Sequence, residues 1–551
     1  MHWTFVAMAL LGQTEPGDGM CEAEPLQPTR LLRRLSLDLT NRIPTPAEAE
    51  AALQGVTPGM IDELLASEGF LEVMRAHHAD LVWPNLDTVE LVPESHMLYP
   101  NRFADGTVVY YSAVRSLLVR QVGETTLYSP CRNEPASYDA DGNLVLEEVR
   151  MGDEVVAYTE GWVEVEPYWA PGTRIKVCAL DALDAPVGRV CPGPRERYPF
   201  ADSQCRGIRA FERFLEEPFE GSTISCNSAF AFLSPDCGCG PNLRNCATRE
   251  VVRDIASQML EQQLRIIDRV IRDGEPYERI LTSNAIEWNG PVVHYLRNHA
   301  PLVLDVYQGE EADWSLPNLD YTDREWVSAP RTGRHAGILT SPGFLLRFAT
   351  DRMRAHRYYN AFECSAFTPT GPLPSPFEPC SQNEDLTERC GCDSCHLTLE
   401  PLASHWGRFI ENGFGELTEE RFPTTADAAG CIPPIESAER LYRCLREYEL
   451  QPTEQREPYR GLLNAYVFED PADYGFIEGG PALRVEEATA SGIVQRCLAE
   501  RMWTEFMGRE PTDAERSTVF PELLDAFERS GRDVKALVRA IVERDAYRRL
   551  P

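Results

Sequence analysis

Basic residues are scarce in this chain of 551 residues. Lys and Arg together number 53 against 87 Asp and Glu, which gives a formal net charge of −34 at pH 7. This surplus of negative charge argues against nucleic acid or an anionic membrane surface as the main partner, because both would repel the protein. A basic redox partner protein, or simple solubility in a salty compartment, fits the charge balance better.

Long apolar segments and common catalytic motifs are also missing. The mostly apolar run at residues 3–12 is too short to span a bilayer but has the size of a signal-peptide core. No Lys or Arg precedes Arg30, so we expect only a weak secretory signal, in residues 1–20. The chain contains no G-x-S-x-G, P-loop, dinucleotide-binding or H-E-x-x-H motif that would indicate another class of enzyme.

Cysteine, by contrast, is abundant. The chain has 17 cysteines, which favours an oxidising compartment over the cytosol. The segment Cys392-Asp-Ser-Cys395-His396 spells C-x-x-C-H, the attachment signature of a c-type haem, and it occurs once. Two thiols three positions apart lie on one face of a helical turn and can each add to a haem vinyl group, while the following imidazole can bind the iron. We therefore predict one covalent haem c on Cys392 and Cys395, with His396 as the proximal iron ligand.

Two other interpretations of these cysteines remain open. Cys390, Cys392, Cys395 and His396 could supply a Cys3His zinc set, with Cys380 as a spare ligand. The same cysteines could instead form plain disulfides. If Cys392 and Cys395 hold haem, 15 of the 17 cysteines remain, so at least one would be free, modified or bonded to another chain.

The sixth iron position would decide what the haem does. A Met or His there gives a closed electron-transfer site, whereas an open position would bind small molecules or peroxide. A second ligand commonly lies downstream of the motif, which favours Met502 or Met507, although Met also often fills a core. The proximity of His405 to His396 in sequence makes binding from the opposite side awkward. The full candidate set is Met353, His356, His405, Met502 and Met507.

Three functional hypotheses follow. The first is an exported, periplasmic c-type cytochrome that passes single electrons, an electron carrier more than a catalyst. The second is a peroxidase-like haem enzyme with an open iron face. The third is a non-haem binding protein stabilised by disulfides or zinc. The oligomeric state, the redox partner and the disulfide connectivity cannot be derived from the sequence.

The pattern of apolar residues predicts a mainly α, multi-domain protein made of helical blocks with a β-rich insertion. Apolar residues make up 43% and charged residues 25% of the chain, as in a packed globular protein. Short runs rich in β-branched and aromatic residues predict strands near 107–111, 145–149, 154–158, 162–166 and 174–178. Apolar spacings of three and four, with capping boxes that begin at Thr45 and Thr512, predict helices near 31–41, 45–53, 57–83, 248–273, 344–362, 402–412, 437–448, 486–507, 512–528 and 532–548.

Within this pattern, Pro401 is expected to end the helix that carries the haem motif. We divide the chain into a candidate signal peptide (1–20), an N-terminal helical region (21–104), the β-rich insertion (105–200), a Cys-rich helical block (201–330), the haem block (331–470) and a C-terminal helical block (471–551).

Several blocks of the chain resemble the planctomycete-type cytochrome c-like proteins, large exported chains built from consecutive domains of unknown function. The resemblance rests on residues 32–40 with 43–48, 281–283 with 289–291, 337–341, Cys364, 392–396, 400–402, 495–509 and 537–541. It implies a c-type haem and export, but no activity. Only C-x-x-C-H is a chemical motif. The chain departs from the family in having Glu400-Pro401 where Asp-Pro is usual, and in its β-rich insertion.

Overall fold

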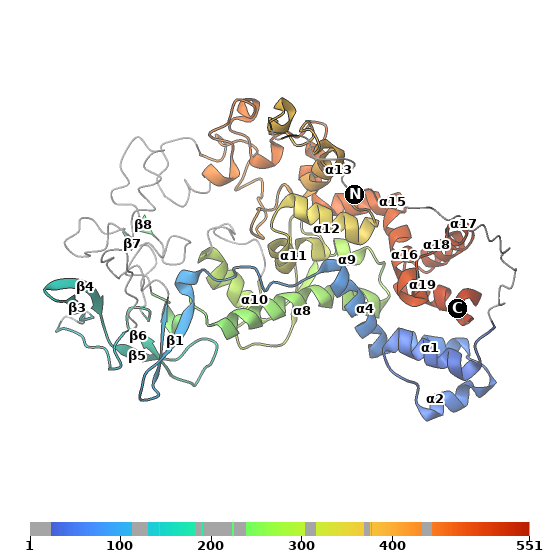
Figure 1. The fold of residues 1–551 in the computed structure, drawn as a ribbon, viewed down its shortest axis with the longest axis horizontal. Coiled ribbons are helices and arrows are strands. Elements are labelled where there is room, and N and C mark those ends of the chain that lie inside the picture. Colours follow the sequence, from blue (N-terminus) through green and yellow to red (C-terminus); the bar gives the residue numbers. More distant parts are fainter. Residues whose placement is uncertain are drawn as a thin grey trace, which may run out of the picture.

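A computed structural model describes residues 24–112, 131–182, 189–190, 223–224, 238–302, 316–367, 375–431 and 444–549, except 141, 143 and 376. Its architecture is mainly α with a β-containing region, which confirms the predicted fold class. Figure 1 shows the sheets at one end of the molecule and the first and last helices together at the other, with the long helix α8 running between them. In the described part, no helix is both long and apolar enough to span a membrane.

The N-terminal region forms four helices. They are α1 (Pro28–Thr40), α2 (Pro46–Ala51), α3 (Pro58–Leu65) and α4 (Glu68–Val82). The predicted capping box at the start of α2 is present, because Thr45 and Glu48 each bond the other's backbone N–H. The prediction of a single helix over 57–83 is wrong. It is divided at Ser67, whose hydroxyl accepts from the backbone N–H of Phe70 at 3.3 Å and begins α4.

The β region contains one four-stranded sheet, in the order β1-β2-β6-β5. Its β2 and β6 are parallel and its other neighbours antiparallel, while β3 and β4 form a separate antiparallel pair. The strands are β1 (Leu98–Arg102), β2 (Val108–Ser112), β3 (Glu147–Met151), β4 (Glu154–Thr159), β5 (Trp162–Val165) and β6 (Ile175–Cys178), with a short pair β7 (Arg189–Val190) and β8 (Thr223–Ile224). All five predicted strands are present, whereas β1, β7 and β8 were not predicted.

The centre of the molecule is built on α8, the longest described helix. Thr248 caps it as its hydroxyl accepts from the backbone N–H of Val251. The predicted helix over 344–362 is divided in two, because Thr350 caps a second helix by accepting from Met353 N–H at 3.3 Å. The elements are α8 (Arg249–Asp273), α9 (Arg279–Thr282), β9 (Ala285–Trp288), α10 (Gly290–His294), the π-helix η6 (Tyr295–His299), β10 (Val327–Pro330), η8 (Gly337–Thr340), α11 (Pro342–Arg347) and α12 (Asp351–Glu363).

The motif helix α13 (Asp393–Ala403) differs from its prediction. Pro401 lies inside α13 instead of ending it, and the chain continues directly into the 3-10 turn η10 (Ser404–Trp406). The helix expected over 402–412 is therefore also wrong beyond Trp406, where the chain turns and Phe409 bridges Glu416. Proline removes one hydrogen bond from a helix. Here the helix continues past Pro401, where Leu402 and Ala403 pack in the apolar core. Of the helix expected over 437–448, residues 437–443 lie outside the described part and 444–447 are helical.

The C-terminal helices cover the N-terminal ones. Each predicted helix here is divided, for example at Gly492, whose φ of 74° separates α15 from α16. Leu26 N–H donates to the carbonyl of Arg548 at 2.8 Å, and the Tyr547 hydroxyl donates to Asp38 at 2.8 Å. One apolar core thus contains residues from both ends of the chain. The helices are α15 (Tyr474–Ala490), α16 (Ile493–Met507), α17 (Asp513–Thr518), α18 (Phe520–Arg529), α19 (Val534–Val542) and α20 (Asp545–Arg548).

The region boundaries at 20, 104, 200, 330 and 470 stay predictions. The candidate signal peptide lies outside the described residues, as do Cys205, Cys226 and Cys237.

Candidate functional site

The haem motif forms the first turn of α13. Cys392 is the residue that caps this helix, and its carbonyl accepts from the backbone N–H of Cys395 at 3.1 Å and of His396 at 3.0 Å. The two cysteines and the histidine therefore lie within one helical turn, as the spacing predicts. All three side chains are partly exposed. Just before the motif, a disulfide between Cys380 and Cys390 closes the preceding loop.

The described cysteines are either paired in disulfides or free thiols. Within the described residues, ten cysteines form five disulfides and two remain free. The two free ones are Cys392 and Cys395. The disulfides are Cys131–Cys178, Cys239–Cys246, Cys364–Cys497, Cys380–Cys390 and Cys431–Cys444. Disulfide bonds are thus present, as the number of cysteines and an oxidising compartment lead one to expect.

The Cys380–Cys390 disulfide also bears on the zinc interpretation. It removes Cys390 and its spare, Cys380, from the four-ligand set, because a bonded sulfur is not a thiolate. Glu378 lies close to the same two sulfurs, so the geometry resembles a three-ligand cluster, but two of its three members are bonded to each other. Only Cys392, Cys395 and His396 of the proposed zinc set keep free ligand atoms.

His396 is held by a carboxylate one helical turn further along α13. Its Nδ1 is hydrogen-bonded to Oε1 of Glu400, and the two side chains are 20% and 15% exposed. Arg352 of α12 donates through its Nε to the same carboxylate oxygen at 2.6 Å. When the Nδ1–H group donates a hydrogen bond to a carboxylate, the free lone pair of the imidazole is on Nε2, the arrangement usual for histidines that bind metals.

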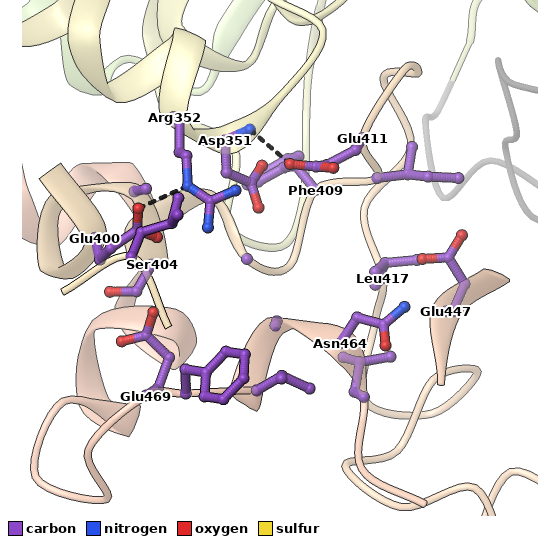
Figure 2. A pocket seen from close by; sticks show the side chains of 18 of the residues that line it. Asp351, Arg352, Glu400, Ser404, Phe409, Glu411, Leu417, Glu447, Asn464 and Glu469 are labelled. Carbon is purple, nitrogen blue, oxygen red and sulfur yellow. Dashed lines mark hydrogen bonds and ion pairs between the residues drawn. The ribbon is translucent and has the colours of Figure 1, made fainter. Parts of the chain in front are cut away.

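A polar cavity of about 530 Å³ adjoins Glu400. Figure 2 shows Arg352 and Glu400 bonded to each other at its edge, with Ser404 and Glu469 below them. Burial, together with the negative charges of Glu400 and Asp473, raises the pKa of Glu469 to about 8, although Arg352 opposes this shift. Glu469 is therefore a protonated carboxyl group at neutral pH, beside the carboxylate that holds His396.

A second cavity, of about 550 Å³, lies along the part of α13 that carries Thr398, Pro401 and Leu402. His405 lines it, with its Nδ1 donating to the carbonyl of Gly480 at 3.0 Å and its ring stacked on Phe476. Burial lowers the pKa of His405 to about 4, so the ring is neutral. None of the three motif residues lines either of these two cavities.

Apolar side chains are exposed beside the motif instead. Leu397, which follows His396 directly, is 63% exposed. Phe377 is 93% exposed and lies three residues before Cys380, whose disulfide fastens that loop to the start of α13. A large planar apolar group attached at Cys392 and Cys395 would find uncovered apolar surface here.

The five candidates for the sixth iron ligand occupy different places. Met502 is fully buried in the core and Met507 packs against that core, which argues against the sequence-based preference for these two. His405 lies nine residues beyond His396 on one continuous helix, about two and a half turns, and so on the opposite face. Met353 and His356 are exposed on α12, the helix whose Arg352 bonds Glu400. The sixth ligand stays unassigned.

Sequence reasoning missed Glu469 and Arg352 as parts of the site. Both lie far from the motif in the chain, and no local pattern distinguishes them from surface charges. Glu400 was noticed only as part of the Glu-Pro step, although its spacing of four residues from His396 places both side chains on one helix face.

Comparison with known proteins adds one similarity. Residues 11–95 match the family model PSCyt2, described as a protein of unknown function (DUF1549). No curated protein and no solved structure matches the chain. The matched segment includes α1 to α4 and the block at 32–48, so the resemblance of that block is confirmed at the level of a domain family. The match ends before the C-x-x-C-H motif, and the N-terminal region is therefore similar to a family whose own function is unassigned.

Proposed function

We propose that this chain is an exported c-type cytochrome-like protein that binds one covalent haem and transfers electrons. The observation that supports it best is the state of the cysteines. Among the described residues, every cysteine outside the C-x-x-C-H motif is in a disulfide, and both cysteines inside it are free. The disulfides favour an oxidising compartment, and c-type haem is attached after export.

The chain's own residues suit such a group. Cys392 and Cys395 would hold it through thioether bonds, and His396 would bind the iron through Nε2. Glu400 accepts from Nδ1 of His396, which fixes the ring and raises its basicity, and Arg352 holds Glu400 in place. The haem, when bound, supplies one-electron redox chemistry.

The test is to express the full chain in a host with haem-attachment machinery, then stain a denaturing gel for haem and record spectra. Covalent haem is expected in the wild type and in Ser394→Ala, a control at an exposed position inside the motif. It is expected to be absent from Cys392→Ala/Cys395→Ala. A colourless wild-type protein that contains zinc would overturn the proposal.

The spectrum of the oxidised protein separates the electron carrier from the haem enzyme. Low-spin, six-coordinate iron supports electron transfer, because a closed coordination sphere leaves no position for substrate. High-spin iron that turns over peroxide would instead establish the peroxidase-like alternative.

A further inference from the structure

Trp83 occupies an unusual position at the end of α4. It is the C-cap residue, in the left-handed conformation with φ 46° and ψ 63°, and its side chain is 57% exposed. Glycine or asparagine normally takes this position, because a bulky side chain there is strained. A strained, exposed tryptophan is the kind of outlier that occurs at ligand-binding sites.

Two arginines lie against this tryptophan. The guanidinium carbon of Arg347, from α11, is 4.9 Å from the centre of the Trp83 ring, and that of Arg357, from α12, is 5.8 Å away. Both guanidinium groups are also within 6 Å of the Phe348 ring. The two cations therefore share the same pair of aromatic rings and lie close to each other, where α12 packs against α4 and α16.

These positive charges are not neutralised. Arg357 and the neighbouring Arg501 of α16 donate to backbone carbonyls, of Asp80 at 2.7 Å and Ala361 at 2.9 Å. Neither they nor Arg347 forms an ion pair with any carboxylate that the structure describes. The Nε atoms of Arg347 and Arg357 are buried and have no acceptor. Burial lowers the pKa of Arg357, and so do the positive charges of Arg501 and Arg347.

This is unexpected in so acidic a protein. With a net charge of −34, carboxylates are plentiful, and other arginines pair with them, as Arg529 does with Asp525 at 2.8 Å. Two N–H donors without acceptors and three neighbouring cations favour the binding of a negatively charged acceptor. The planar guanidinium groups offer parallel N–H donors, which suit an oxyanion.

We propose that Arg347, Arg357 and Trp83 form a binding site for a small oxyanion group. Arg501, next to Arg357, supplies a third positive charge. Phosphate, sulfate and carboxylate share this chemistry, either as free ions or as groups on a larger ligand. The site is separate from the haem motif, because Arg352 of α12 reaches α13 whereas Arg357 contacts α4. It does not depend on haem attachment.

The test is calorimetric titration of the full chain with sodium phosphate, sulfate and acetate at constant ionic strength, with chloride as the reference ion. We expect saturable binding of at least one oxyanion, weakened about tenfold or more in Arg347→Gln/Arg357→Gln. Arg529→Gln, which removes an exposed and paired arginine, should bind as the wild type does. The ranking of the three ions identifies the group.

Thermal unfolding gives an independent measurement on the same proteins. Because the double variant loses two cations that repel each other, its melting temperature in chloride should not fall, and phosphate or sulfate should stabilise only the wild type and Arg529→Gln. The proposal is overturned if the wild type binds no oxyanion in preference to chloride. It is equally overturned if the double variant is folded and binds as tightly as the wild type.

Discussion

If the proposed haem is attached, replacing Glu400 by glutamine tests whether the carboxylate beside His396 affects the reduction potential of the iron. Glutamine keeps the size of the side chain and one acceptor oxygen. It removes the negative charge of the carboxylate, which accepts hydrogen bonds from Nδ1 of His396 and from Nε of Arg352. His396 then becomes a weaker electron donor, and the oxidised iron, which carries the extra positive charge, loses more stabilisation than the reduced iron. The reduction potential should therefore rise.

The size of the rise follows from the hydrogen bond that changes. A hydrogen bond to a charged group contributes roughly 1 to 1.5 kcal/mol more than a neutral one. For a one-electron couple this difference corresponds to about 40–60 mV if only the oxidised form loses it, so this range is the upper limit of the rise. Potentiometric titration of the haem-loaded protein, followed by its absorption bands, measures the shift.

Glu411→Gln is the matched control. Glu411 lines the same cavity and accepts from the backbone N–H of Asp351 at 3.2 Å, but it does not contact His396. Its replacement removes the same charge and should move the potential much less. If both variants shift the potential equally, only general charge matters and the pairing of Glu400 with His396 has no special role. A downward shift in Glu400→Gln would contradict the reasoning outright.

The remaining predictions concern protons and stability. The potential of the wild type should fall as pH rises through about 8, where Glu469 loses its proton, and Glu469→Gln should remove this step from a titration of potential against pH. Burial lowers the pKa of His294 to about 4, below its unfolded value of about 6.5. Because the unfolded chain then binds a proton that the folded chain does not, the free energy of unfolding is highest above pH 6.5 and decreases as the pH falls towards 4. The loss is about 3 kcal/mol, and urea unfolding at pH 7 and pH 4.5 should show a smaller pH dependence in His294→Gln. Arg354 is fully buried and donates to Asp351 at 2.8 Å and to the carbonyl of Ile410 at 2.7 Å, so Arg354→Met should lower the free energy of unfolding by about 3–5 kcal/mol in the same assay. A change under about 1 kcal/mol would show that these bonds contribute little.

Local signals in the sequence predicted local structure well. The Thr45 and Thr512 capping boxes, the amphipathic helix α8 and the alternating strands of the β region all depend on neighbouring residues, and all are present. Helix breaks were missed where a single side chain or a left-handed residue decides the break, as at Ser67 and Gly492. Apolar periodicity continues across such positions, and only the tertiary packing shows that the chain changes direction there.

The candidate site was predictable only in part. The C-x-x-C-H spacing identified Cys392, Cys395 and His396, because the chemistry lies within one helical turn. The residues around Glu400 come from elsewhere in the chain: Arg352 from α12 and Glu469 from the segment before α15. Likewise, the Cys364–Cys497 disulfide joins residues 133 positions apart, a pairing that depends on the fold and that no spacing rule supplies.

The most direct measurement is peptide mapping by mass spectrometry of the chain purified from a host that attaches haem. The peptide containing residues 392–396 should carry the mass of one haem, while Cys380 and Cys390 should be found bonded to each other. The same peptide carrying no haem, with Cys392 and Cys395 joined in a disulfide, would contradict the assignment.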